Sequence, residues 1–219
     1  MTRNCLIYGA GGFGREVAWL LRDYHLEHGE LGPLGFVDDD TRLLGTALND
    51  LPVMRWETAQ REYPGAPMVL AFGSPETRAA VISHRGDVGF WFPKVVHPSV
   101  RKSDYVSIGD GTVICAHSIL TTDIIIGKHT HINLSCTIGH DVIVGDFCTV
   151  SPGAHLSGWV HLGNQVFVGS GAVFINGTQN EPLVIGEGAI IGAGAVVTRS
   201  VAAGETVVGI PAKPIEKKA

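Results

Sequence analysis

The sequence predicts a two-part protein: a small α/β domain over residues 1–105 and a triangular β-helix over residues 106–219. In the first part, short apolar strands alternate with segments of helical periodicity, which is typical of α/β folds. The second part has no helical period but repeats a large apolar residue every six positions. In addition, 17 of the 29 glycines follow residue 105, whereas most charged residues precede it. This change in composition marks the domain boundary.

The composition excludes several classes of protein. Of the 219 residues, 45% are hydrophobic and 17% are charged, so the chain has enough apolar surface to fold. A net charge of −5 disfavours general nucleic-acid binding, which needs a basic face. No apolar run approaches the roughly 18 residues of a membrane span, and the start of the chain lacks the apolar core of a signal peptide. Four cysteines without a C-x-x-C spacing favour a cytoplasmic protein.

The first part predicts a small parallel sheet. Apolar segments indicate strands over residues 4–8, 34–37 and 68–72, each followed by glycine or by acidic residues. Apolar residues at helical spacing indicate helices over residues 15–24 and 76–84. Strands that alternate with helices form βαβ units. Residues 1–105 supply only about half of the elements of a full doubly wound domain.

The second part contains a hexapeptide repeat, which indicates a solenoid. Counted in sixes from residue 108, twelve successive positions carry a large apolar side chain, and glycine follows six of them. The position four residues after each is small or β-branched. The twelve apolar residues are Ile108, Ile114, Leu120, Ile126, Ile132, Ile138, Val144, Val150, Leu156, Leu162, Val168 and Phe174.

A six-residue repeat corresponds to one short strand and one turn. Three such units close a triangular coil of about 18 residues, and coils stack at the strand spacing of about 4.8 Å. The register breaks after Phe174 and resumes at Ile185, eleven residues later instead of twelve. We therefore expect residues 175–184 to form a loop that projects from the coil, and such loops often line a binding surface.

A glycine pattern, Gly9-x-Gly11-x-x-Gly14, lies between the first predicted strand and the first predicted helix. Such a turn can hold phosphate on backbone N–H groups at a helix N-terminus. Because the domain is only half the size of a dinucleotide fold, we favour a mononucleotide diphosphate over NAD. Asp38 or Asp39 would then contact the ribose or the base. The alternative is that these glycines serve only a tight turn.

Three features together resemble one bacterial family: the hexapeptide run, the opening IYGAGGFG at residues 7–14 and the ending GIPAK at residues 209–213. The family is the left-handed β-helix acyltransferases of nucleotide-amino-sugars and sialic acid, the PglD/NeuD type. The resemblance covers nearly the whole chain. It implies a Rossmann-like nucleotide-sugar-binding domain, a left-handed parallel β-helix, acetyl-CoA as co-substrate, and a homotrimer with active sites between subunits.

The resemblance further implies N-acetylation of a nucleotide-linked 4-amino-sugar in bacterial surface-glycan biosynthesis. O-acetylation of sialic acid or another sugar is the alternative. The family's substrate-binding positions fall on residues that surround the glycine-rich turn and the ends of the next strands. They are Gly11, Gly12, Phe13, Asp38, Asp39 and Gly73, and Phe13 stands where the family often has histidine.

His140 is the expected general base. Acyl transfer from a thioester needs a group that takes the proton of the attacking amine or hydroxyl, a donor for the oxyanion and close approach. Among the ten histidines, His140 is followed directly by an acid, Asp141, and lies one coil from Gly158. The missing side chain at Gly158 is expected to leave a passage for the pantetheine arm. The family's base also falls on His140, with Asp141 in place of its usual glutamate partner.

The same correspondence gives acetyl-CoA contacts at Thr149, Gly158, Ser170 and Ala193. The backbone N–H of Gly158 or Ser170 would face the thioester oxygen. The alternative is that all four are ordinary turn positions. Three lysines near the end of the chain are further candidates for the CoA phosphates, or are simply solvated: Lys213, Lys217 and Lys218.

Two rival classes also use triangular β-helices. A carbonic anhydrase of the γ class needs three zinc-binding histidines, two of them five residues apart, and no two of the ten histidines have that spacing. We therefore expect no metal site. A non-enzymatic β-helix that binds ice or serves as a scaffold needs flat arrays of threonine, which this chain lacks. An enzyme is the preferred interpretation.

Overall fold

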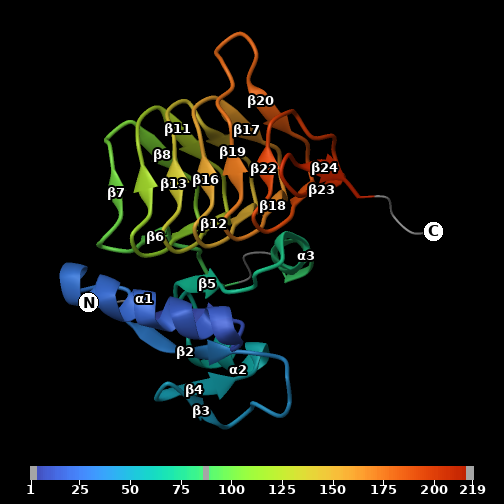
Figure 1. The fold of residues 1–219 in the computed structure, drawn as a ribbon. Coiled ribbons are helices and arrows are strands. Elements are labelled where there is room, and N and C mark those ends of the chain that lie inside the picture. Colours follow the sequence, from blue (N-terminus) through green and yellow to red (C-terminus); the bar gives the residue numbers. More distant parts are fainter. Residues whose placement is uncertain (1–3, 86–88, 216–219) are drawn as a thin grey trace.

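The computed structural model describes residues 4–85 and 89–215, which form an α/β domain and a β-helix stacked on it (Figure 1). A five-stranded sheet with the order β3-β4-β2-β1-β5 is the centre of the α/β domain, and only the β3–β4 pair is antiparallel. Its elements are β1 (Cys5–Tyr8), α1 (Gly12–His28), β2 (Pro33–Val37), β3 (Ala47–Leu48), β4 (Leu51–Met54), α2 (Trp56–Glu62), β5 (Met68–Leu70) and α3 (Pro75–Arg85).

The three strands and two helices predicted for this domain are confirmed as β1, β2, β5, α1 and α3, with α1 extended at both ends. The sequence analysis missed the β3–β4 hairpin and α2. The hairpin turn is made by Asn49 and Asp50, both with positive φ, which fits a two-residue turn between very short strands. Strands of two and four residues leave too little alternation to be recognised.

The β-helix has three faces, each a parallel sheet except for its last pair on one face. The β13 face contains β7 (Arg101–Lys102), β10 (Ile119–Leu120), β13 (Thr137–Ile138), β16 (His155–Leu156), β19 (Val173–Phe174) and β22 (Val196–Val197). The β14 face contains β8 (Val106–Ile108), β11 (Ile124–Ile126), β14 (Ile143–Val144), β17 (Val160–Leu162) and β20 (Leu183–Ile185). The β15 face contains β6 (Val95–Val96), β9 (Val113–Ile114), β12 (His131–Ile132), β15 (Thr149–Val150), β18 (Phe167–Val168), β21 (Ile190–Ile191), β23 (Thr206–Val208) and β24 (Lys213–Pro214).

The hexapeptide residues fill the interior of this prism, as predicted. Eleven of the twelve are buried and pack in one continuous cluster, and Ile108 at the open end is partly buried against it. Eleven of the twelve small or β-branched residues four positions later are also buried, for example Cys136 and Ala154 with 0% exposure, whereas Thr178 is exposed in the loop after β19. Burial of one large and one small residue per strand therefore holds each coil to the next.

Two boundaries differ from the expected ones. β6 and β7 pair with β9 and β10, so the first coil begins at Val95, about ten residues before the expected boundary at 105. Counted back in sixes from Ile108, the exposed Lys102 stands where the repeat places a large apolar residue, which is why the repeat was not recognised there. The expected loop at 175–184 is also shorter, because Leu183 and Val184 pair with β17 as part of β20. The loop therefore spans residues 175–182.

The α/β domain covers the first coils of the β15 face, whereas Ile190 of β21 on the same face is exposed. Outward-facing side chains of this face, Val113, His131 and Thr149, are buried, whereas the corresponding Ile125 and Ile143 on the β14 face are exposed. One apolar cluster joins α1 to the first coils. In Figure 1 the α/β domain lies beneath the β-helix, and the loop between β19 and β20 projects from the opposite edge.

Candidate active site

His140 lies at the corner where the β13 face turns into the β14 face. Its Nδ1 is 2.8 Å from the Asp141 carboxylate, and the imidazole is half exposed. Asp141 has a φ of 58° and its N–H donates to the Thr122 carbonyl of the preceding coil, so the tight corner fixes the carboxylate. An Nδ1–H directed at a carboxylate leaves Nε2 as the basic nitrogen. The pair therefore has the geometry of an oriented general base.

Gly158 lies directly against this imidazole. A Cβ at Gly158 would be 2.4 Å from His140 Cε1 and 2.5 Å from Nε2. The expected open passage beside His140 is therefore wrong, since the imidazole itself occupies that space. The expected free N–H is also engaged, because Gly158 N donates to Asn176 Oδ1 at 2.9 Å. The absence of a side chain at 158 gives the histidine its position.

Replacement of Gly158 by alanine is expected to displace the His140 ring and to lower kcat at least about tenfold, because small misplacements of a catalytic group are costly. Gly158 has no positive φ and its Cβ would meet a movable ring, so the melting temperature should change little. Steady-state kinetics and thermal unfolding of Gly158→Ala test this. An unchanged kcat would contradict the role assigned to the contact.

The remaining residues expected at acetyl-CoA lie elsewhere. Ser170 and Ala193 are exposed and occupy equivalent positions on successive coils, at the corner between the β15 and β13 faces. Ser170 and His140 are therefore at different corners of the same prism. Lys213 is exposed on β24, and Lys217 and Lys218 lie outside the described residues.

Thr149 is a correction. Its side chain is 3% exposed on the β15 face, beneath the α/β domain. The hydroxyl donates to the Gly73 carbonyl at 2.8 Å and accepts a bond from Arg78 Nη2 at 3.0 Å. A threonine covered in this way is not available to acetyl-CoA, so the expected cofactor contact is wrong. The repeat alone shows that Thr149 points outward, not that another domain covers it.

A cavity of about 430 Å³ lies at the carboxyl ends of β1 and β5. The N-termini of α1 and α3 both begin at its wall, and α1 has no side-chain cap on its first N–H groups. Two helix N-termini that converge on one cavity favour an anionic group such as a diphosphate. The lining residues are Gly9, Gly11, Gly12, Phe13, Asp38, Ala71, Phe72, Gly73, Ser74 and Thr77.

The glycines of this cavity separate into two groups. Gly9 has a φ of 108°, and a Cβ at Gly14 would lie 1.9 Å from the Gly9 carbonyl oxygen, so these two serve the turn itself. At Gly11, Gly12 and Gly73 a Cβ would meet nothing within 4 Å. Their lack of a side chain has no packing reason. It leaves backbone open to a ligand, which favours the binding interpretation over a turn alone.

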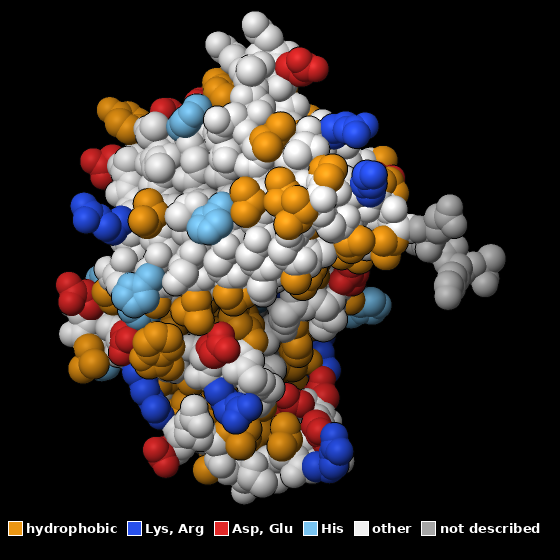
Figure 2. Space-filling view, viewed as in Figure 1, with side chains coloured by type: hydrophobic (Ala, Val, Ile, Leu, Met, Phe, Trp, Pro, Cys, Tyr) orange, Lys and Arg blue, Asp and Glu red, His pale blue; other side chains and the backbone are white. Residues whose placement is uncertain are grey.

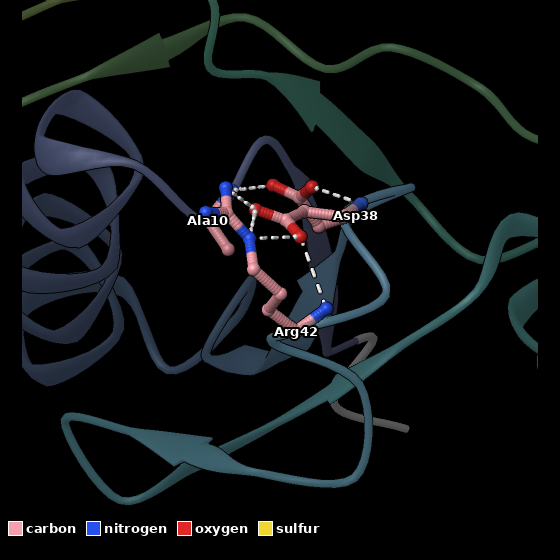
Figure 3. Close-up of polar contacts among 4 residues, drawn as sticks. Ala10, Asp38 and Arg42 are labelled. Carbon is pink, nitrogen blue, oxygen red and sulfur yellow. Dashed lines mark hydrogen bonds and ion pairs between the residues drawn. The ribbon is translucent and has the colours of Figure 1, made fainter.

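Asp38 joins the glycine-rich turn to the end of β2 (Figure 3). Its Oδ2 accepts the Ala10 N–H at 2.7 Å and its Oδ1 accepts the Asp40 N–H at 2.9 Å. Each oxygen keeps a second acceptor site for a ribose hydroxyl. Asp38 is also one of the residues that line the cavity, as expected. Beside it, Arg42 holds the pKa of Asp40 low, at about 2, by hydrogen bonding.

Asp39 is directed away from the cavity. Its carboxylate accepts bonds from the Tyr8 hydroxyl at 2.8 Å and from Arg85 Nη2 at 2.9 Å. Burial and the hydrogen bond to Asp39 raise the pKa of Tyr8. Of the six expected substrate-binding residues, five line the cavity and Asp39 does not.

The cavity and His140 lie on opposite sides of the β-helix within one chain. Gly73 at the cavity wall contacts Thr149 on the β15 face, whereas His140 is at the corner opposite that face. The loop of residues 175–182, which extends from the His140 corner, lies at the far edge from the α/β domain in Figure 1. One protomer therefore does not bring its nucleotide cavity and its histidine together.

A depression near the end of the β-helix is lined by Lys213 together with Arg199 and Glu205. A larger depression of about 830 Å³ lies at the domain junction, between Tyr24, Trp91 and the Lys94–Asp110 ion pair. Over residues 4–85 and 89–215, no group of three potential ligands is close enough to hold a metal ion. Within the same ranges, no helix is long and apolar enough to cross a bilayer.

A parallel β-helix with a histidine–aspartate pair at a corner and a phosphate-type cavity in an attached α/β domain defines an acyltransferase of the hexapeptide-repeat class. No family model matches the chain. A GDP-perosamine N-acetyltransferase from Escherichia coli is 36% identical over 213 residues, which span 96% of this chain and 96% of the relative.

Two solved structures cover both domains. WeeI from Acinetobacter baumannii AYE is 36% identical, with a TM-score of 0.88 over 97% of this chain and 99% of its own. A histidine-to-asparagine variant of perosamine N-acetyltransferase from Caulobacter crescentus, in complex with CoA and GDP-perosamine, is 29% identical. Its TM-score is 0.87 over 98% of this chain and 97% of its own. The chain belongs to the left-handed β-helix acetyltransferases of the PglD/NeuD type, as the sequence indicated.

Sequence reasoning missed the role of two residues. Asn176 binds the Gly158 N–H beside the expected base, and Arg78 is wholly buried between the domains. The burial of Arg78 could have been inferred from its helical spacing, because Arg78 lies three residues after Pro75 and four before Ile82, on the side of α3 that faces the core. The proximity of Asn176 to this site could have been inferred from its position, two 18-residue coils after His140 and one after Gly158.

Proposed function

We propose that this protein transfers an acetyl group from acetyl-CoA to the amino group of a nucleotide-linked 4-amino-sugar, in the cytoplasm. The observation that carries the proposal is the cavity at Gly11, Gly12 and Gly73, where backbone without side chains meets two helix N-termini. Similarity to a GDP-perosamine N-acetyltransferase along 96% of both chains supports an amine as acceptor over the hydroxyl of the alternative reaction.

In the proposed reaction His140 is the general base. Nε2 accepts a proton from the sugar amine while the amine nitrogen attacks the thioester carbonyl carbon. Collapse of the tetrahedral intermediate forms the amide and breaks the C–S bond, and the protonated imidazole returns its proton to the CoA thiolate. Asp141 accepts the Nδ1–H bond and stabilises the imidazolium between these steps. Ser170 and Ala193 are the proposed cofactor-contacting residues, with Gly158 acting through the position of His140.

We infer that the active site combines two subunits of a homotrimer. The nucleotide cavity and His140 are on opposite sides of one β-helix, so only a neighbouring copy can supply the second half. Exposed apolar side chains flank the His140 corner: Ile119 and Val173 on the β13 face, and Ile125 and Ile143 on the β14 face. Figure 2 shows hydrophobic side chains on the face turned to the viewer. Cyclic packing of three prisms would bury these rows.

A binding assay can identify the base of the nucleotide that the substrate carries. Both the Escherichia coli relative and the Caulobacter crescentus structure are named for GDP-perosamine, so we propose guanosine diphosphate as the carrier. Thermal unfolding with GDP, UDP, dTDP and CMP, each with and without CoA, tests this. GDP is expected to raise the melting temperature most, because a ligand at 100 times its Kd stabilises by about 2.7 kcal/mol. A shift with CoA but with none of the four nucleotides would contradict the proposed substrate class.

A further inference from the structure

Arg78 of α3 is a wholly buried arginine at the junction of the two domains. Its exposed fraction is 0%, and its hydrogen-bond partners among the described residues are carbonyl and hydroxyl oxygens, not carboxylates. Burial lowers the pKa of Arg78 only to about 10, so the guanidinium is charged at neutral pH. A buried charge is retained only where hydrogen bonds compensate its desolvation.

The guanidinium bonds reach both domains. Nη1 donates to the Phe72 carbonyl of its own domain at 2.6 Å. The other bonds cross to the β-helix, from Nε to the His129 carbonyl at 3.0 Å and from Nη2 to the Phe147 and Cys148 carbonyls and the Thr149 hydroxyl at 2.7, 2.8 and 3.0 Å. One side chain therefore connects the segment after β5 to two coils.

Thr149 makes the second connection. Its hydroxyl accepts from Arg78 and donates to the Gly73 carbonyl at 2.8 Å. Phe72 and Gly73 are wall residues of the nucleotide cavity. The carbonyls of two successive wall residues are thus held by groups that are anchored on the β15 face.

We propose that Arg78 and Thr149 are positioning residues for the nucleotide-sugar, because they fix the 72–74 segment of the cavity wall on the β-helix. The inference rests on the proposed function of the cavity. A nucleotide held by backbone N–H groups needs that backbone within about 0.5 Å of its productive place. The same bonds set the distance between the nucleotide cavity and the β-helix, and hence the reach of the sugar amine toward the acetyl donor.

The planar fork of arginine is what this connection needs. The Nε, Nη1 and Nη2 atoms each donate to oxygens of separate segments, and three acceptors share the two hydrogens of Nη2, whereas a lysine has three donors on one atom. Arg78→Lys therefore keeps the positive charge and removes the geometry. Thr149→Val keeps the shape of the side chain and removes the hydroxyl bridge to Gly73.

The test measures the Kd of GDP and of CoA by calorimetry for the full chain, for Arg78→Lys and for Thr149→Val. Arg61→Met, which removes an exposed arginine of α2, is the matched control. We expect GDP binding to weaken about tenfold in both test variants, while CoA binding stays within about twofold. The control should bind both ligands as the unaltered chain does.

Two outcomes would overturn the inference: an unchanged Kd for GDP in Thr149→Val, or an equal loss of GDP and CoA affinity, which indicates general destabilisation. If Arg78→Lys does not fold, Thr149→Val decides alone. An unaltered chain that binds CoA but no nucleotide refutes the proposed function itself, which separates the two failures.

Discussion

Replacement of His140 by alanine is expected to lower kcat by about 10²–10⁴-fold, the usual contribution of a general base. The imidazole is the group whose Nε2 is left basic by the bond between Nδ1 and Asp141. The ring is half exposed at a turn and fills no core position, so the variant should fold and assemble as the unaltered chain does. Steady-state kinetics with saturating acetyl-CoA and nucleotide-sugar at neutral pH measure the effect.

A matched control is His84→Ala, which removes an exposed histidine of α3 whose Nδ1 lies 2.7 Å from the Ala80 carbonyl oxygen of its own helix. This variant is expected to keep kcat within about twofold. If His140→Ala keeps a kcat near that of the unaltered chain, His140 is not the general base. The turn at His140 and Asp141 would then have only a structural role.

Mixed trimers are expected to regain activity from two inactive chains. Gly11→Leu places a side chain in the open space of the nucleotide cavity and should abolish nucleotide binding without strain, since the backbone at Gly11 is extended. His140→Ala lacks the base but keeps the cavity. If each active site joins the cavity of one subunit to the histidine of another, a mixed trimer contains some sites with both functional halves.

Random assembly of equal amounts gives a functional cavity and a functional histidine at about one site in four, so about a quarter of full activity is expected. The two chains are unfolded and refolded together, or coexpressed, so that subunits of both kinds assemble at random. Each variant refolded alone is the control. Mixtures no more active than the sum of the two variants would show that one chain builds the whole site, and would contradict the opposed positions of Gly73 and His140.

Much of the fold follows from local patterns in the sequence. The six-residue period identifies the β-helix because each coil repeats the same requirement for one large interior side chain, from Ile114 to Phe174. The first coil, with β6 and β7, was not recognised because Lys102 stands where the six-residue period places a large apolar residue. The cavity residues Gly11, Gly12 and Asp38 were also recognisable, since a phosphate-binding turn is a local structure between one strand and one helix.

The sequence by itself determined the fold class, the family and the pairing of His140 with Asp141, since all of these depend on neighbours along the chain or on a fixed 18-residue step. Only the tertiary structure decided what covers each face of the prism. Thr149 and His140 have equally outward positions in the repeat, yet the α/β domain buries Thr149 and leaves His140 exposed. The reason is physical: a repeat fixes the direction of a side chain within its coil, whereas burial depends on a second domain whose docking is set by distant contacts such as those of Arg78.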